Sequence, residues 1–218
     1  MAKRDYSLLG PDAERAIATG LATAQWYHSD IDRQDMKALM KREDQPAIRD
    51  TVILFGAMAL FAGLGIALWP LWWSAPFWLA YGVLYGSAMD SRWHECGHGT
   101  AFRTGKYNDW VYQIASFCMV RNPVTWRWSH ARHHTDTVIV GRDPEIVAMR
   151  PPALFRIVLN VFGILDAVSG WKRMVLNAMG KLDAEEITYI PESEHHKVAK
   201  VAQIWVLIKR TAICRGGF

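Results

Sequence analysis

The sequence has few cysteines and no apolar leader at its start. The three cysteines among its 218 residues, Cys96, Cys118 and Cys214, are odd in number and far apart. Their spacing excludes a disulfide framework and a CxxC metal site, so we expect reduced thiols in a cytosol-facing environment. The first twenty residues lack the apolar core of a signal peptide, and we therefore expect no cleaved targeting segment.

Charge is also sparse, at 21% of residues, whereas hydrophobic residues make up 51% and tryptophan occurs eleven times. The net charge of +4 and the pI near 9.0 alone would be compatible with nucleic-acid binding. However, the basic residues are dispersed around an uncharged block and do not form one stripe. This distribution favours a membrane protein with basic flanks, and we expect no nucleic-acid partner.

The uncharged block runs from Thr51 to Met89, 39 residues in all. One helix needs about 20 apolar residues to cross the hydrocarbon core, so the block is long enough for two crossings. Trp69-Pro70 and Ser74-Ala75-Pro76 supply a turn near its middle, and a tryptophan cluster around this turn is typical of a membrane interface. A buried hairpin of a soluble protein is the alternative, but nothing else in the chain could cover it. The sequence thus predicts a transmembrane hairpin.

Lysine and arginine set the expected orientation of this hairpin. Residues 31–50 carry five basic residues and residues 90–106 carry three, whereas the connecting turn carries none. Both ends of the hairpin should therefore face the cytosol. The basic residues on the two flanks are Arg33, Lys37, Lys41, Arg42 and Arg49 before the hairpin, and Arg92, Arg103 and Lys106 after it.

The remaining apolar runs are too short to span a bilayer. Trp110–Val120 and Ile157–Leu165 predict interfacial helices, Val201–Ile208 predicts the opening turns of a third crossing, and 31–50 predicts a helix outside the membrane. We find no internal repeat or low-complexity segment. The expected protein is all-α, integral to the membrane and multi-pass. Its expected parts are a cytosolic segment (1–50), a transmembrane hairpin (51–89), a cytosolic or interfacial histidine-rich region (90–196) and an incomplete third crossing (197–218).

Five histidines form two tight clusters in the histidine-rich region. The first is His94-Glu95-Cys96-Gly97-His98 and the second is His130-Ala131-Arg132-His133-His134. On a helix, residues three or four apart lie on the same face, so each cluster can present its imidazoles to a metal. No segment between them can cross the bilayer, which places both on the cytosolic face. Imidazole ligands suit Fe, Zn, Cu or Ni and exclude Mg or Ca.

The first cluster also fits the HExxH pattern of zinc proteases, in which two histidines bind zinc and the glutamate is the general base. Here that base would be Glu95, and a membrane protease would need a further ligand, for which Asp166 is a weak candidate. Such an enzyme has no use for the second cluster. A site with more histidine ligands than one zinc accepts is therefore favoured.

Two stretches resemble the histidine boxes of membrane acyl-lipid desaturases. HECGHGTAF (His94–Phe102) resembles their first box, and WRWSHARHHTDTVIVGRDPE (Trp126–Glu145) resembles their second box. With the preceding hairpin, the resemblance covers roughly residues 50–150. The paired boxes are specific for the membrane di-iron superfamily of desaturases, hydroxylases and carotenoid ketolases, and the HECGH form favours an acyl desaturase.

The resemblance implies a non-haem di-iron centre that uses O2 as co-substrate to remove hydrogens from an acyl chain of a lipid or thioester. Electrons would come from a separate donor such as a ferredoxin or cytochrome, because the sequence has no flavin, haem or Fe–S motif. Glu95, Asp136, Asp143 and Glu145 are candidates to orient the imidazoles, or are solvated or ion-paired carboxylates, with Arg132 and Arg142 as their structural partners. The implied iron ligands are His94, His98, His130, His133 and His134.

Desaturases carry a third box, of HxxHH type, after a second membrane hairpin, and this sequence shows neither. Glu192-Ser193-Glu194-His195-His196 imitates the end of such a box but precedes an apolar run. We therefore expect a C-terminally truncated, incomplete and inactive chain, with His195 and His196 in a basic juxtamembrane segment. A non-catalytic membrane protein that keeps five histidines is the remaining alternative.

Overall fold

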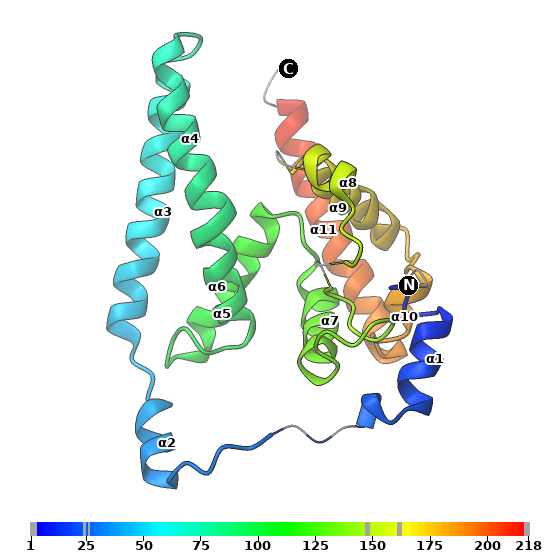
Figure 1. Ribbon diagram of the computed structural model, residues 1–218. Helices are drawn as coiled ribbons and strands as arrows, with labels where there is room; N and C mark the ends of the chain where they lie inside the picture. The colour runs from blue at the N-terminus through cyan, green and yellow to red at the C-terminus, as the bar shows by residue number, and fades with distance from the viewer. Residues whose placement is uncertain (1–3, 24, 26, 147–148, 161–162, 216–218) are drawn as a thin grey trace. The chain divides into compact units, whose positions relative to one another are not determined.

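The computed structural model of the chain describes residues 4–215 apart from 24, 26, 147–148 and 161–162, with side chains through residue 211. Every regular element in these ranges is helical, which confirms the all-α prediction. The chain forms two compact units, residues 29–119 and residues 1–28 together with 120–218 (Figure 1). The side chain of Cys214 lies outside the described part.

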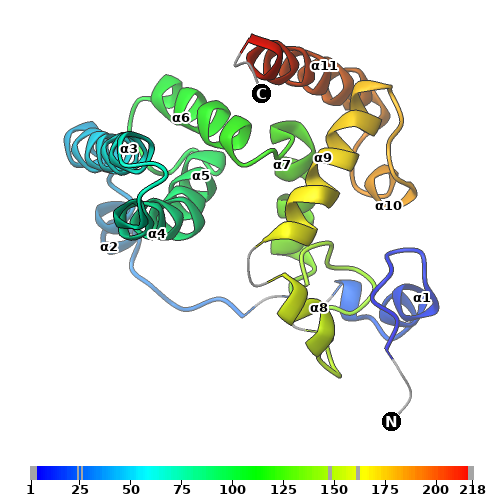
Figure 2. The ribbon, with the colours of Figure 1, turned by 90° about the horizontal axis from the view of Figure 1, so that it is seen from above.

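The unit of residues 29–119 is built on two long helical segments that lie side by side (Figures 1 and 2). Gly65 permits their close approach, because a Cβ atom there would lie 2.7 Å from the Trp78 ring. The turn between the segments falls where the prolines predict it. The elements are α2 (Arg33–Leu39), α3 (Asp44–Ala67), η2 (Trp72–Ser74), α4 (Ala75–Val83), the π-helical turn η3 (Leu84–Ala88), α5 (Met89–Gly97) and α6 (Gly105–Cys118).

The helix predicted over residues 31–50 is interrupted. α2 ends at Leu39, and α3 begins at Asp44. Pro46 explains the break, because its ring clashes with the carbonyl of residue 42 in a continuous helix and it has no N–H to donate. In the third position of α3 the same proline is tolerated. The single-helix prediction is therefore wrong over residues 40–43.

The helix predicted at Trp110–Val120 is present as α6 and packs against α5. Trp93 of α5 is 2% exposed and donates from Nε1 to Ser116 Oγ at 2.7 Å, and its ring stacks on that of Tyr112. The loop between the two helices is closed by Asn108, which binds both backbone groups of Phe102. These contacts hold the first histidine cluster at a fixed end of α5.

The second unit combines the N-terminal segment with the helices after residue 120. α9 and α11 pack together, and Gln203 of α11 donates to the Ala178 carbonyl at 2.9 Å. The segment before α1 joins α10 through the carboxylate of Glu185, which accepts from Ser7 Oγ and Leu8 N. The elements are α1 (Pro11–Ala18), η1 (Leu21–Thr23), α7 (Pro123–Thr135), α8 (Leu154–Leu159), α9 (Ile164–Ala178), α10 (Ala184–Ile187) and α11 (Glu192–Arg215).

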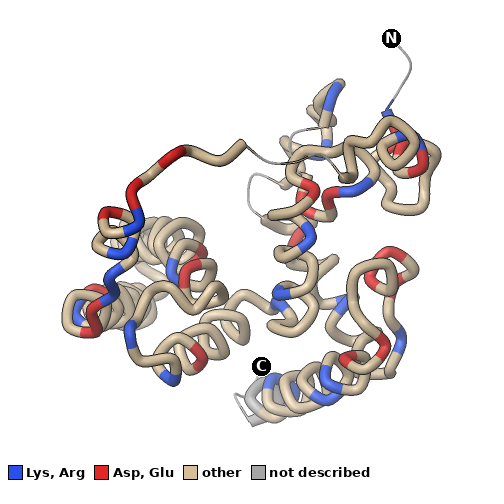
Figure 3. Tube along the Cα trace, turned by 90° about the horizontal axis from the view of Figure 1, so that it is seen from below, with Lys and Arg blue, Asp and Glu red and all other residues tan. Residues whose placement is uncertain are grey.

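Two apolar runs in this unit fold differently from the prediction. Ile157–Leu165 is not one helix, because α8 ends at Leu159 and α9 starts at Ile164, with 161–162 outside the described residues. Val201–Ile208 lies in the middle of α11, which begins nine residues earlier with charged residues (Figure 3). Among the described residues, the one helical stretch long and apolar enough to cross a membrane contains α3.

We predict that Asn108→Ala lowers the free energy of unfolding by about 2–4 kcal/mol, because it leaves the buried Phe102 N–H and carbonyl without their partner. Denaturant titration in detergent micelles measures the loss. The exposed neighbour Lys106 serves as control, and Lys106→Ala should change little. Equal stability of the two variants would contradict the bridging role of Asn108.

Candidate metal centre

The first histidine cluster lies at the C-terminal end of α5. His94 is in the last turn and His98 is the residue that caps it, so the two rings lie on one helical face. Their Nε2 atoms are 3.2 Å apart. Two nitrogen ligands at about 2.0–2.1 Å from one metal ion are separated by roughly 3 Å, so this pair is spaced to bind one ion.

The second cluster lies on α7, where the sequence predicts a helix. The Nε2 atoms of His130 and His134 are 3.0 Å apart. The His133 ring centroid lies 5.4 Å from that of His130 and 5.8 Å from that of His134. All three imidazoles of the second cluster therefore gather at one side of the helix.

Two carboxylates bind the other ring nitrogens in this cluster. His130 Nδ1 lies 2.7 Å from Glu145 Oε2, and His133 Nδ1 lies 2.9 Å from both Asp143 oxygens. A ring that donates from Nδ1 to a carboxylate carries its lone pair on Nε2 and is held in one orientation. The orienting role predicted for Asp143 and Glu145 is thus matched by their geometry.

The carboxylates are themselves fixed by a tight loop after α7. Asp143 is 3% exposed and accepts from the backbone N–H groups of Val138 and Glu145. Gly141 has φ +78° and sits against α1, where a Cβ atom would lie 2.4 Å from Ala13 N. Only glycine fits this close approach, so α1 supports the loop that carries both orienting carboxylates.

Glu95 and Asp136 have other partners. Glu95 Oε2 binds Arg92 at 3.1 Å, one turn away on α5. Asp136 binds Arg142 at 2.9 Å and Arg132 at 3.5 Å. Glu95 and Asp136 are therefore ion-paired, which is one of the alternatives considered for them from the sequence. Arg132 and Arg142 are both structural partners of Asp136.

Sequence reasoning missed two residues that hold the second cluster. The indole of Trp126 stacks on the His130 imidazole, with ring centroids 4.3 Å apart and 15° between the planes. Ser129 Oγ donates to Glu145 Oε1 at 2.8 Å. The four-residue spacing of Trp126 and His130 was a usable signal, whereas the contact between Ser129 and Glu145 depends on the fold of the loop.

The remaining histidine and acid candidates lie elsewhere in the second unit. The Nε2 atom of His195 lies 3.2 Å from the Ile190 carbonyl at the start of α11, and His196 is exposed. Asp166, considered as a ligand for a zinc protease, accepts from the Asn160 side chain at 2.8 Å. Each contact is explained by local structure.

We predict that Glu145→Gln weakens metal binding about 10–100-fold, because the His130 ring loses its anionic partner. Equilibrium titration of detergent-solubilised protein with Fe²⁺ or Co²⁺ measures this. Glu95→Gln is the matched control, since Glu95 contacts Arg92, and its metal affinity should stay near wild type. Equal losses in both variants would rule out an orienting role specific to Glu145.

We also predict unequal thiol reactivity beside the first cluster. Cys96 is fully buried, and burial raises its pKa to about 12, whereas Cys118 is exposed. Because the thiolate is the reactive form, alkylation at pH 8 should modify Cys118 and spare Cys96 in a Cys214→Ser background. Mass spectrometry of the folded and denatured protein checks this. Rapid modification of Cys96 in the folded protein would show that α5 and α6 are not packed as described.

Comparison with known proteins identifies the family. A profile described as "Fatty acid desaturase" matches residues 67–212, well over half of the chain. The chain is 24% identical to the sn-2 acyl-lipid omega-3 desaturase (ferredoxin), chloroplastic, of Arabidopsis thaliana over 77% of its own length and 38% of the relative. It is 34% identical to the acyl-lipid (9+3)-(E)-desaturase of Dimorphotheca sinuata over 34% of this chain and 20% of the relative.

A third relative is the Delta(12)-oleate desaturase of Trichosanthes kirilowii, with 31% identity over 43% of this chain and 27% of the relative. No solved structure matches the chain significantly. In these three alignments the chain spans 20% to 38% of the length of its curated relatives. The profile match extends across both histidine clusters, and the chain belongs to the fatty acid desaturase family.

Proposed function

We propose that this chain carries the first two histidine boxes of an O2-dependent, non-haem di-iron desaturase that introduces a double bond into an acyl chain. The observation that carries the proposal is the orientation of the second cluster. Glu145 and Asp143 bind the Nδ1 atoms of His130 and His133, and His130 Nε2 lies 3.0 Å from His134 Nε2. Together with the desaturase family match, this arrangement supports iron as the metal.

The proposed iron ligands are His94 and His98 from the first cluster and His130, His133 and His134 from the second. Bound iron would supply the O2 chemistry that removes hydrogens from an unactivated acyl chain. The chain's own contribution is to hold the imidazole rings in one orientation, with Nδ1 of His130 and His133 on carboxylates. Trp126 limits rotation of the His130 ring by stacking, and the buried carboxylate of Asp143 fixes His133.

We propose that α3 and the segment formed by α4 and η3 form a transmembrane hairpin with both ends on the cytosolic side. α3 leaves large apolar side chains uncovered, as a lipid-facing helix does: Val52 is 65% exposed, Ile53 61% and Ile66 65%. The α4 segment contributes Leu79, which is 71% exposed. Further crossings, and hence a multi-pass protein with its active site at the cytosolic face, are part of this proposal.

The proposed substrate is an acyl group carried by a membrane lipid, because several relatives are named as acyl-lipid desaturases. A thioester-linked acyl chain is the alternative. The proposed electron donor is a separate ferredoxin, since the names of the desaturases from Arabidopsis thaliana and Synechocystis include the word ferredoxin. A cytochrome would serve the same role. Both proposals, for the substrate and for the donor, rest on the names of the relatives.

The five histidines are few for two iron ions, which take about five or six ligands each even when oxygen or water bridges them. We therefore propose that a polypeptide of these 218 residues alone does not assemble an active di-iron centre. A related hydroxylase or ketolase would share the same clusters. A zinc protease would instead require Glu95 as base, and Glu95 is bound to Arg92.

We predict that the detergent-solubilised chain carries iron when it is purified and yields no new double bond in the lipids of the expressing cells. Metal analysis by mass spectrometry and lipid profiling measure both. Replacement of each of the five histidines by alanine should lower bound iron, whereas the matched control His196→Ala should not.

Three other outcomes would decide between the alternatives. Two irons per chain with desaturated lipids would overturn the incomplete-centre proposal. A product with an added hydroxyl or keto oxygen would indicate a hydroxylase or a ketolase. Bound zinc together with peptide cleavage that Glu95→Gln abolishes would contradict the desaturase assignment.

A further inference from the structure

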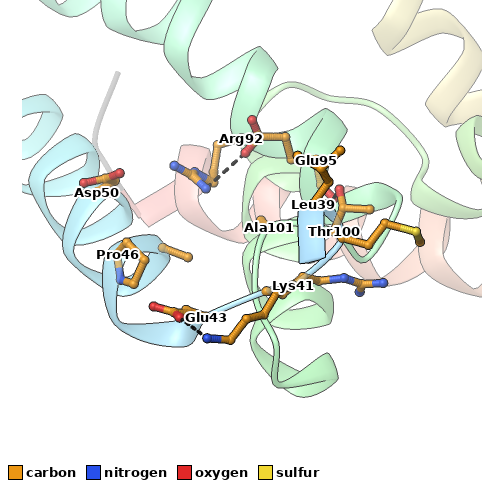
Figure 4. Close-up of a pocket in the computed structure, with 12 residues that line it drawn as sticks. Leu39, Lys41, Glu43, Pro46, Asp50, Arg92, Glu95, Thr100 and Ala101 are labelled. Carbon is orange, nitrogen blue, oxygen red and sulfur yellow. Dashed lines mark hydrogen bonds and ion pairs between the residues drawn. The ribbon is translucent and has the colours of Figure 1, made fainter. Parts of the chain in front are cut away.

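Two cavities lie side by side in the unit of residues 29–119, between the α2–α3 connection and the loop after α5. They share Met40, Lys41 and Arg42 in their linings. The larger, of about 560 Å³, is shown in Figure 4. The smaller, of about 420 Å³, adds Arg103. Neither cavity includes a histidine of the proposed metal centre.

The two cavities differ in charge. The larger one contains carboxylates as well as cations in its lining, and Figure 4 shows Arg92 paired with Glu95 and Lys41 paired with Glu43. The smaller one is lined by three cations and one methionine, with no carboxylate in its lining. An anion would therefore be attracted to the smaller cavity.

Two carboxylates, Glu43 and Asp44, follow Arg42 in the sequence, and each is bound to another side chain. Glu43 binds Lys41 at 3.0 Å. Both oxygens of Asp44 accept from Thr104, at 2.8 Å from its N–H and 2.6 Å from its hydroxyl. These hydrogen bonds lower the pKa of Asp44 and keep it ionised at neutral pH. The Asp44 bonds also tie the loop that carries Arg103 to the start of α3.

Two guanidinium groups in this cavity form no ion pair at contact distance with a carboxylate among the described residues. Arg42 donates to the Gly99 carbonyl, which fixes its side chain but does not neutralise it. Arg103 is exposed and forms no ion pair within 4 Å in the described part of the chain, although the ionised Asp44 carboxylate attracts it at longer range. Guanidinium groups bind phosphate oxygens through paired hydrogen bonds, and two of them beside an ammonium suit a phosphate better than a carboxylate.

The distance of the cavity from the membrane surface follows from its place at the start of α3. From Asp44 at the start of α3 to Thr51, the first residue of the uncharged block, the helix rises about 10 Å. Headgroups extend roughly 5–7 Å beyond the hydrocarbon core on each side. If α3 spans the bilayer, the start of α3 lies about 3–5 Å outside the headgroup layer, so the Arg42 and Arg103 side chains reach the lipid phosphates from the aqueous side.

We propose that Lys41, Arg42 and Arg103 form a binding site for a phosphate group, carried by an anionic phospholipid headgroup or by a free phosphate. The site is independent of metal binding and of desaturation. Its occupation would fix the connection between α2 and α3 against the loop after the first histidine box, because Arg42 and Thr104 already join these segments.

The test is a calorimetric titration of the detergent-solubilised chain with three probes. These are inorganic phosphate, short-chain phosphatidic acid below its micelle concentration, and short-chain phosphatidylcholine. Phosphatidic acid or phosphate should bind more tightly than phosphatidylcholine. Phosphatidic acid binding much more tightly than phosphate identifies a lipid site, and equal affinity identifies a site for free phosphate. No preference for either anion over phosphatidylcholine would overturn the proposal.

The variant Arg42→Gln/Arg103→Gln should weaken binding of the preferred probe by about tenfold or more, because two charge-assisted contacts are lost. Arg33→Gln/Lys37→Gln is the matched control, since it removes two charges from α2 outside the cavity. Arg103→Gln alone keeps the Arg42 contact with Gly99 and should also weaken binding. An equal loss in the control, or full binding by both cavity variants, would contradict the site.

Discussion

The protein depends on a simple geometric constraint, the four-residue spacing of histidines on a helix. It brings the Nε2 atoms of His94 and His98 to 3.2 Å and those of His130 and His134 to 3.0 Å. Two imidazoles so close either share a proton or share a metal ion, and the anionic partner at Glu145 favours a ring that carries its lone pair on Nε2. The metal proposal and the assignment of roles follow from this arrangement.

In each unit, buried polar contacts support the helix or loop that carries one histidine cluster. In residues 29–119, Asn108 closes the loop after the first box and Trp93 fixes α5 against α6. In the other unit, the loop after α7 holds Asp143 and Glu145, and α1 packs on that loop at Gly141. The N-terminal segment therefore supports the histidines of the second cluster through this loop, a connection that could not be read from the sequence.

Helix content, the position of the turn near Pro70 and the histidine clusters were predictable because periodicity, proline and short-range spacing are local properties. The sequence named four acids as candidates to orient the rings, but it did not distinguish the two that contact histidines from the two that bind arginines. Glu95 is next to His94 in the sequence but forms an ion pair with Arg92 on the same helix. Glu145 contacts His130 because the loop after α7 folds back onto that helix. The break before α3 and the early start of α11 were missed because the prediction followed the apolar runs. Apolar runs show which part of a helix is hydrophobic, whereas Pro46 and polar residues determine where these helices begin.

The central proposal is that both histidine clusters face the same side of the membrane and hold iron there. Single cysteines at Thr100→Cys and Thr135→Cys, two exposed positions beside the two clusters, test it in a chain without its own cysteines. Labelling with an impermeant thiol reagent in vesicles of known orientation should modify both positions from the cytosolic face only. Labelling of the two positions from opposite faces would exclude a shared centre and contradict the account.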